Sequence, residues 1–282
     1  MSQRIAIIDI GSNSIKMTVS QKDGDKITTV EKFRETVRLG QGISVDGKMS
    51  SDAIERAYAS LVSLKEKAEK AGSDKILAVA TAAVRQAKNK DKFVDMINEV
   101  GIDFRILSEW DEAYYGFMGI RSAVELDDYA IIDVGGGSSE ISLVRGGKLL
   151  ESRSLSFGAV ILTEIASEED MYDFIMEHID KISFIDDCKG LGIIGLGGTA
   201  DAACKMFDKD EISIDELNTG YEKVKNTPVQ NRGAIDGVPD DRGDIILGGM
   251  TIIKAFADKI GAPTLRMCKS GIRDGILREG CK

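Results

Sequence analysis

Short apolar segments alternate with longer amphipathic ones along the whole chain. Apolar or alternating runs predict strands in these ranges: 4–9, 14–20, 26–30, 75–80, 104–107, 129–133, 140–144, 149–154 and 191–195. Apolar residues at helical spacing predict helices in these ranges: 51–71, 90–100, 109–124, 168–184, 200–207, 244–260 and 272–278. Strands that alternate with helices indicate an α/β protein with some parallel pairing. The segment 220–242, which holds Pro228 and Pro239, is predicted to be a long mobile loop.

One supersecondary unit occurs twice in the chain. The run Ile5–Gly11 matches the run Tyr129–Gly135 position by position, and each carries an aspartate at the same place, Asp9 and Asp133. In both copies a polar or glycine-rich loop follows, and it leads into an alternating strand, a turn and a further strand. The repetition of a whole unit predicts two lobes of related topology.

Length and charge narrow the class of protein. A chain of 282 residues is long enough for two domains, which the repeat places at 1–124 and 125–282. The formal net charge of −10 repels nucleic acid and anionic membranes, so neither is an expected partner, and an anionic ligand must be held by local groups. No apolar run approaches a signal-peptide core or a bilayer span, which predicts a cytoplasmic protein.

The cysteines stand far apart without paired spacing, which argues against a zinc site or a disulfide framework and favours buried thiols. They are Cys188, Cys204, Cys268 and Cys281. The single histidine, His178, lies in the middle of a predicted helix among acids and is interpreted as structural. A Ser/His/Asp hydrolase is therefore not expected.

Three loops that contain glycine each follow a predicted strand: Asp9–Ser14, Asp133–Glu140 and Gly195–Ala200. Glycine allows a tight turn and lets backbone amides approach a phosphate without a Cβ atom in the way. Each loop alone is equally well explained as a tight turn, but the three together favour a phosphate-binding cleft between the lobes. The sequence contains neither a phosphate loop that ends in Gly-Lys-Ser/Thr nor a dinucleotide fingerprint.

Several motifs follow one another along nearly the whole chain. They are Asp9–Ile15, Val37–Gly42, Ala80–Ala87 with Asn89, Glu112 with Ala113, Asp133–Glu140, Gly195–Ala200 and Gly271–Leu277. In these motifs the chain resembles the exopolyphosphatase and guanosine pentaphosphate phosphohydrolase (Ppx/GppA) family, within the superfamily of actin, sugar kinases and heat-shock chaperones. The resemblance implies two ribonuclease-H-like lobes with a cleft between them. The chain is similar to the short, two-domain form of the family, and its last helix is a candidate to pack back on the first lobe.

The resemblance implies roles for four acidic residues. Glu112 is expected to be the general base that takes a proton from the water attacking the terminal phosphorus. Asp133 and Glu140, assisted by Asp9, are expected to bind Mg²⁺ or Mn²⁺, because magnesium prefers a few carboxylates together with water and substrate oxygens. Taken alone, Glu112 would be interpreted as an exposed helix acid, and either aspartate as a turn-capping residue.

The resemblance also implies a set of phosphate-binding groups. Arg85 is expected to grip a phosphate with its planar guanidinium, and a solvated helix residue is the alternative interpretation. Arg38 is a weaker candidate, for a distal phosphate. The remaining members of the set are loop residues: Asn13, Gly135, Gly136, Gly137, Ser138, Gly197, Gly198 and Thr199.

The chain departs from the family pattern just before Glu112. The family usually has a glycine in this loop, whereas this chain has the run Ser108-Glu109-Trp110-Asp111. The geometry of the loop and the charge around the expected base therefore stay open.

The predicted function is a metal-dependent phosphohydrolase. It would release terminal phosphate from inorganic polyphosphate, with short chains favoured by the acidic charge balance, from guanosine pentaphosphate (pppGpp), or from both. Two alternatives stay open: a kinase of the same superfamily, and a non-catalytic sensor that binds polyphosphate or guanosine tetraphosphate. The expected partner is a small anion, and a homodimer is expected from the resemblance alone.

Overall fold

The computed structural model describes residues 2–24 and 26–280 of the chain. The chain divides into two compact units. The first comprises Met1–Gly119 with Ile272–Lys282, and the second comprises Ile120–Gly271. The chain therefore passes from one unit to the other twice, within helix α5 (Glu109–Arg121) and at the start of helix α11 (Ile272–Glu279).

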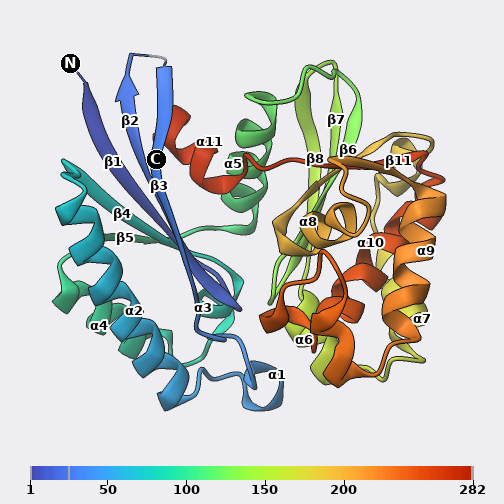
Figure 1. The fold of residues 1–282 in the computed structure, drawn as a ribbon, viewed down its shortest axis with the longest axis horizontal. Helices are drawn as coiled ribbons and strands as arrows, with labels where there is room; N and C mark the ends of the chain where they lie inside the picture. The colour runs from blue at the N-terminus through green and yellow to red at the C-terminus, as the bar shows by residue number, and fades with distance from the viewer. Residues whose placement is uncertain (1, 25, 281–282) are drawn as a thin grey trace. The chain divides into compact units, whose positions relative to one another are not determined.

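The sheet of the first unit has the strand order β3-β2-β1-β4-β5 (Figure 1). Its strands are β1 Gln3–Ile10, β2 Ser14–Asp23, β3 Lys26–Thr36, β4 Lys75–Ala80 and β5 Asp103–Ile106. The first three strands pair antiparallel, whereas β1, β4 and β5 run parallel to one another. Parallel strands end at the same edge of a sheet, so the segments after β1, β4 and β5 all leave from one edge.

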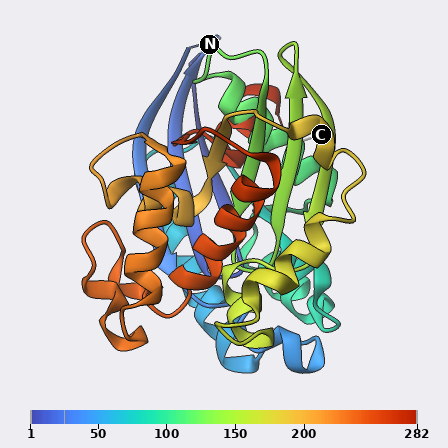
Figure 2. The same cartoon turned by 90° about the vertical axis from the view of Figure 1, so that its right-hand side faces the viewer.

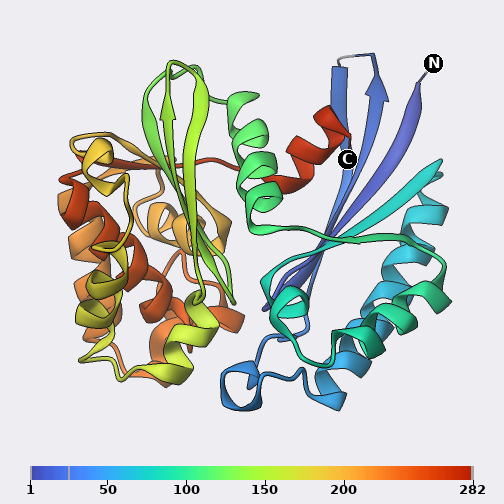
Figure 3. The same ribbon diagram turned by 180° about the vertical axis from the view of Figure 1, so that it is seen from behind.

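Helices cover both faces of this sheet, with α2 and α4 on one face and α5 and α11 on the other (Figures 1 and 3). The helices of this unit are α1 Ile43–Asp46, α2 Ser51–Lys70, α3 Ala82–Gln86, α4 Lys90–Val100, α5 and α11. Tyr115 of α5 and Ile276 of α11 pack with Ile7 and Leu77 of the strands in one buried cluster. Burial on both faces explains why β1 is an almost continuous apolar run rather than an alternating one.

The position of α11 depends on a glycine. A Cβ atom at Gly275 would lie 2.0 Å from the carbonyl oxygen of Tyr115, so a larger residue would force α11 away from α5. The Lys22 Nζ atom donates to the Leu277 carbonyl at 2.8 Å, and the Tyr115 hydroxyl donates to the Gly280 carbonyl at 3.3 Å. These contacts hold α11 within the first unit.

The sheet of the second unit has the strand order β10-β11-β9-β6-β7-β8. Its strands are β6 Tyr129–Val134, β7 Ser139–Arg145, β8 Lys148–Leu155, β9 Ile193–Leu196, β10 Glu211–Ser213 and β11 Thr264–Met267. Strands β6, β7 and β8 pair antiparallel, and β6, β9 and β11 run parallel. Apart from the added edge strand β10, the order and directions repeat those of the first sheet, as the sequence repeat predicts.

Helix α8 packs against β6, β9 and β11, and α10 packs against β6 and the helices α6, α7 and α9 (Figure 2). The helices are α6 Ala159–Ile165, α7 Met171–Ile179, α8 Gly197–Lys205, α9 Ile214–Lys225 and α10 Ile246–Ile260. Three 3₁₀ turns complete the unit: η1 Ile185–Cys188, η2 Val229–Ala234 and η3 Asp240–Arg242. Within the described ranges, no helix of either unit is long and apolar enough to cross a bilayer.

Some observed elements differ from the predicted ones. The helix predicted at 168–184 is the shorter α7, and the helix predicted at 200–207 already begins at Gly197. The third glycine segment is therefore the first turn of a helix. Strands β10 and β11, of 3 and 4 residues, were not predicted.

The segment 220–242 is not a long loop: α9 continues to Lys225, and η2 and η3 follow. Arg232 fixes it, because its side chain is 3% exposed and its Nε atom donates to the carbonyl groups of Val224 and Thr227 at 3.0 and 2.9 Å. Its terminal nitrogens donate to the two carboxylate oxygens of Glu168 at 2.7 and 2.9 Å. The prediction of a long loop from proline and glycine content was wrong, because the segment forms helical turns and a buried arginine ties them to the rest of the unit.

The Arg232–Glu168 pair predicts a pH-dependent stability. The hydrogen bonds from Arg232 hold the pKa of Glu168 below its ordinary value of 4.5. A lowered pKa in the folded state adds stability that is complete above pH 4.5 and is lost as the pH falls through the folded-state pKa. Glu168→Gln should lower the free energy of unfolding at pH 7 by about 1 kcal/mol, because water screens the half-exposed carboxylate.

Urea unfolding at several pH values measures this effect. The difference between wild type and Glu168→Gln should shrink below pH 4.5. Glu169→Gln, at the exposed neighbouring residue, is the control and should behave as wild type. A difference that stays constant down to pH 3, or an equal effect of Glu169→Gln, would contradict this account.

Candidate active site

The edge of the first sheet where β1, β4 and β5 end carries three of the predicted site residues. Asn13 follows β1, Arg85 follows β4 on α3, and Glu112 follows β5 on α5. The strand ends are held together, because Thr81 N donates to Ile10 O at 3.3 Å and Leu107 N donates to Ala80 O at 2.9 Å. Parallel pairing therefore brings residues that are far apart in the sequence to one edge of the first unit.

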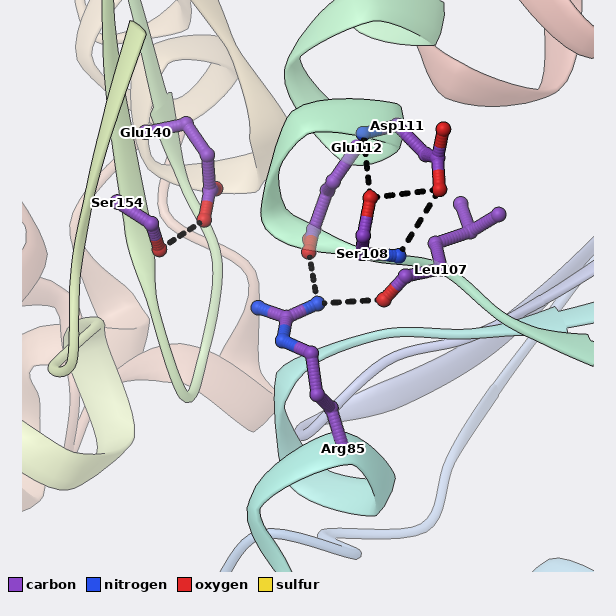
Figure 4. Close-up of polar contacts among 7 residues, drawn as sticks. All are labelled: Arg85, Leu107, Ser108, Asp111, Glu112, Glu140 and Ser154. Carbon is purple, nitrogen blue, oxygen red and sulfur yellow. Dashed lines mark hydrogen bonds and ion pairs between the residues drawn. The ribbon is translucent and has the colours of Figure 1, made fainter.

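Arg85 and Glu112 form a shielded ion pair at this edge (Figure 4). The Nη1 atom of Arg85 donates to Glu112 Oε2 at 2.8 Å and to the Leu107 carbonyl at 3.0 Å. The side chains are only 17% and 9% exposed. The Nη2 atom of Arg85 is buried and has no hydrogen-bond partner among the described residues, and in Figure 4 the other terminal nitrogen points away from both partners. A guanidinium with an unused donor suits an oxygen of an anion.

The loop before Glu112 is organised by a serine and an aspartate. The Ser108 hydroxyl donates to Asp111 Oδ2 at 2.6 Å, and the amides of Ser108 and Asp111 donate to the partner side chain at 3.2 and 3.1 Å. This reciprocal pattern is a capping box at the start of α5. Glu112 N donates to Ser108 O at 3.0 Å, which is the first backbone hydrogen bond of α5. The capping box therefore fixes the position of the Glu112 backbone. The run Ser108-Glu109-Trp110-Asp111 thus gives α5 a fixed start.

The other predicted residues of the first unit lie on β1 and its loop. Asn13 is buried, and its Nδ2 atom donates to Ser14 Oγ at 3.4 Å. Its backbone carbonyl accepts from Arg38 N at 2.9 Å. Arg38 has a φ of 51°, a left-handed conformation that is uncommon for arginine. Asp9 lies opposite Lys16 across β1 and β2. The structure brings Asn13 and Arg38 together, and the residue opposite Asp9 in the strand register is a lysine rather than another acid.

Asp133 and Glu140 face each other on neighbouring strands of the second unit. They are directly opposite in the β6–β7 register, so both side chains lie on one face of the sheet. Glu140 is buried, and its Oε1 atom accepts a hydrogen bond from the Ser154 hydroxyl on β8 at 2.9 Å (Figure 4). Among residues 2–24 and 26–280, no group of three or more His, Cys, Asp or Glu side chains is arranged to hold a metal ion. Two adjacent carboxylates nevertheless fit Mg²⁺ or Mn²⁺, because such ions take a few carboxylates and complete their shell with water and substrate.

The second glycine loop, residues 135–138, is fixed through its carbonyl groups. Gly135 O accepts from Ala159 N at 2.9 Å, and Gly136 O accepts from Val160 N at 3.0 Å, so the loop caps the start of α6. The amides of Gly136, Gly137 and Ser138 donate to no group in the described part of the chain. Free amides on a loop held in place by its carbonyls are suited to an anion.

The third glycine segment follows β9, which runs parallel to β6, so it leaves the sheet beside the second loop. Gly197 has a φ of 85°, and a Cβ atom there would lie 3.0 Å from Asp133 Oδ1. The segment opens α8, whose first amides have no partner within the helix. Thr199 Oγ1 is buried and has no hydrogen-bond partner in the described part of the chain. Asp133, Gly197, Gly198 and Thr199 are thus brought together.

Arg242 of η3 was not predicted. Its guanidinium lies so close to Gly198 that a Cβ atom there would be 2.3 Å from Arg242 Cζ, and the residue is 8% exposed. A buried cation against the first turn of α8 adds positive charge where the helix already favours an anion. Nothing in the spacing of Gly220–Arg242 marks this arginine, and only the fold places it against the glycine segment.

The thiols and the histidine belong to the packing of the second unit. Burial raises the pKa of Cys188 and of Cys204 to about 11 each, and Cys268 is also buried. Buried thiols were predicted and are confirmed for these three residues, and Cys281 lies outside the described residues. His178 packs its ring against Phe157 and Phe174, and its Nδ1 atom lies 2.8 Å from Phe174 O.

The Ppx/GppA phosphatase family is matched by residues 18–182, more than half of the chain. The chain belongs to this family. It is 28% identical to a bifunctional 3-dehydroquinate synthase/phosphatase of Fusobacterium nucleatum, over 98% of this chain and 46% of that protein. It is 27% identical to a guanosine-5'-triphosphate,3'-diphosphate pyrophosphatase of Pseudoalteromonas translucida, over 98% of this chain and 58% of that protein. The chain thus spans about half the length of these curated relatives.

Solved structures agree with the family assignment. A Ppx/GppA family member of Aquifex aeolicus is 25% identical and superposes with a TM-score of 0.80, covering 99% of this chain and 97% of that one. A structure described as an exopolyphosphatase of Cytophaga hutchinsonii is 22% identical with a TM-score of 0.90, covering 99% of both chains, and shows likeness of fold. The predicted fold of two α/β units with related sheets is confirmed by the strand orders of the two units and by these superpositions.

Proposed function

We propose that the protein is a phosphohydrolase that releases the terminal phosphate of inorganic polyphosphate or of guanosine pentaphosphate. The observation that carries the proposal is the shielded pair of Arg85 and Glu112, in which a carboxylate lies beside a guanidinium with an unused donor. A phosphoryl group needs these two functions beside each other: a cation for its oxygens and a base for the attacking water. Membership of a phosphatase family supports the same reaction.

Arg85 and Glu112 would divide the work at the terminal phosphate. The free Nη2 atom of Arg85 would donate to a phosphoryl oxygen and hold the phosphorus near the carboxylate. Glu112 would accept a proton from a water placed in line with the bond that breaks. The water oxygen would bond to the terminal phosphorus while the bond from that phosphorus to the bridging oxygen breaks. The leaving chain would depart as an anion, shorter by one phosphate.

The second unit would neutralise the charge of the phosphates. The free amides of residues 136–138 and of the first turn of α8, with Arg242 beside that turn, would donate to phosphate oxygens. Asp133 and Glu140 would hold Mg²⁺ or Mn²⁺, and an assisting role of Asp9 stays a prediction. The bound ion would neutralise charge on the bridging phosphates.

The choice of substrate follows from charge and from the relatives. The net charge of −10 repels a long polyanion at every step of binding, so short polyphosphates suit the protein better than long ones. The Pseudoalteromonas relative is named for guanosine-5'-triphosphate,3'-diphosphate, and the Cytophaga structure for exopolyphosphatase, which supports both substrate classes. A cytoplasmic location and a homodimer stay predictions.

Glu112→Gln tests the base. The variant keeps the size of the side chain but cannot accept the proton, so kcat for phosphate release should fall by roughly 10² to 10⁴-fold. Phosphate release is measured with Mg²⁺ on short polyphosphate, long polyphosphate, guanosine pentaphosphate and ATP. Glu109→Gln, at an exposed acid in the same turn of α5, is the control and should keep wild-type activity.

Two outcomes would contradict the proposal. Wild-type rates in Glu112→Gln would remove Glu112 from the role of base. Binding of the phosphates by wild type without any release would replace the hydrolase by a sensor, and transfer of phosphate from ATP to an acceptor would indicate a kinase.

The capping box before Glu112 gives a second test. Ser108→Ala removes the cap, which should cost about 1 kcal/mol in the free energy of unfolding and should lower kcat by roughly 10-fold through misplacement of the base. The matched control is Ser213→Ala, because Ser213 forms the capping box of α9 with Glu216. Thermal unfolding and phosphate release are measured for both variants.

The comparison separates stability from position. Both variants should lose similar stability, but only Ser108→Ala should lose activity. Equal activity in the two variants would show that the start of α5 does not position Glu112.

A further inference from the structure

We propose that Ser154 is a positioning residue for Glu140, and that it fixes this carboxylate for a divalent cation. The inference rests on the proposed function, in which Glu140 is a ligand of Mg²⁺ or Mn²⁺. It concerns a side chain on β8, which belongs to none of the glycine loops and to none of the motifs of the family.

The geometry joins the two residues directly. Glu140 of β7 and Ser154 of β8 are opposite each other in the strand register, and the Ser154 hydroxyl donates to Glu140 Oε1 at 2.9 Å. Asp133 lies opposite Glu140 on its other side. The three residues therefore form one row across β6, β7 and β8, on the same face of the sheet. Figure 4 shows the Ser154 hydroxyl directed at the carboxylate.

A glutamate needs such a partner more than an aspartate does. The longer side chain of Glu140 has one more rotatable bond than that of Asp133, so its carboxylate has more positions to choose among. A hydroxyl has one hydrogen to donate, and a bond to Oε1 leaves the lone pairs of the carboxylate that a cation requires. Groups that hold metal ligands in this way commonly change metal affinity or activity by 10- to 100-fold when they are removed.

A neighbouring pair shows what a purely structural serine looks like. Ser142 and Ser152 are also opposite each other on β7 and β8, two residues along and on the same face. Their hydroxyl groups bond to each other at 2.9 Å, and no carboxylate takes part. Ser152 is thus matched to Ser154 in residue type, strand and face, and it differs in its partner.

Binding of Mn²⁺ to the full chain tests the proposal, with free Mn²⁺ measured by electron paramagnetic resonance. Wild type and four variants are compared: Ser154→Ala, Ser154→Thr, Ser152→Ala and Glu140→Gln. Ser154→Ala should raise the Kd for Mn²⁺ by about 10- to 100-fold. Ser154→Thr keeps a hydroxyl group, on a residue type that suits a strand, and it should bind Mn²⁺ with an affinity close to that of wild type. Ser152→Ala should bind Mn²⁺ as wild type does, and Glu140→Gln should lose the site.

The contrary outcomes are distinct. If Glu140→Gln loses Mn²⁺ but Ser154→Ala binds it as wild type does, Ser154 has no positioning role and the proposed function stands. If Ser152→Ala weakens binding as much as Ser154→Ala, the effect is loss of strand pairing, and the proposal is overturned. If wild type binds no Mn²⁺, the metal site of the proposed function fails and the role of Ser154 fails with it.

Discussion

Parallel pairing of strands from distant parts of the chain is the constraint on which each unit depends. In the first sheet β1, β4 and β5 end at one edge, so the segments that carry Asn13, Arg85 and Glu112 all start there. In the second sheet β6 and β9 end together, which sets the loop 135–138 beside the first turn of α8. Both sheets have this arrangement of strands, so in each unit the loops that follow the parallel strands lie side by side. The chemistry of each unit comes from residues that the strand ends present.

Burial strengthens the interaction of these residues with an anion, although the protein as a whole is strongly negative. A chain with a net charge of −10 does not attract an anion at long range, so a phosphate must be held by groups at close quarters. Arg85 provides such a group, because its guanidinium is shielded from water and only one of its terminal nitrogens is used. Charge interactions are stronger where water is excluded, and an unused donor there is costly unless a ligand accepts its hydrogen bond.

Much of the fold was predictable, because it follows from the local hydrophobic pattern and from the sequence repeat. The repeat of Ile5–Gly11 at Tyr129–Gly135 predicted two related sheets, and most strands lie within a few residues of the predicted ranges. The pattern failed where tertiary contacts decide the structure. Proline and glycine in Gly220–Arg242 suggested a mobile loop, but a buried Arg232 holds its turns in place.

The candidate site was predictable in its residue types more than in its contacts. The glycine segments and the acids were predicted from motif order, because backbone amides and carboxylates that bind phosphate and metal require particular residue types at particular places. The bond from Arg85 to Glu112 was not predictable, since it joins residues that are 27 positions apart and is made only when β4 and β5 pair. Arg242 and Ser154 were missed for the same reason: an arginine in a turn and a serine on a strand have no signature until the fold shows their neighbours.

The most direct test of the central claim is to follow oxygen during one turnover of short polyphosphate in ¹⁸O-labelled water. The claim is that water attacks the terminal phosphorus. The account predicts that the released phosphate carries one ¹⁸O atom and that the shortened chain carries none, as measured by mass spectrometry. Label in the shortened chain, or released phosphate without label, would contradict it, because water would then not have attacked the terminal phosphorus.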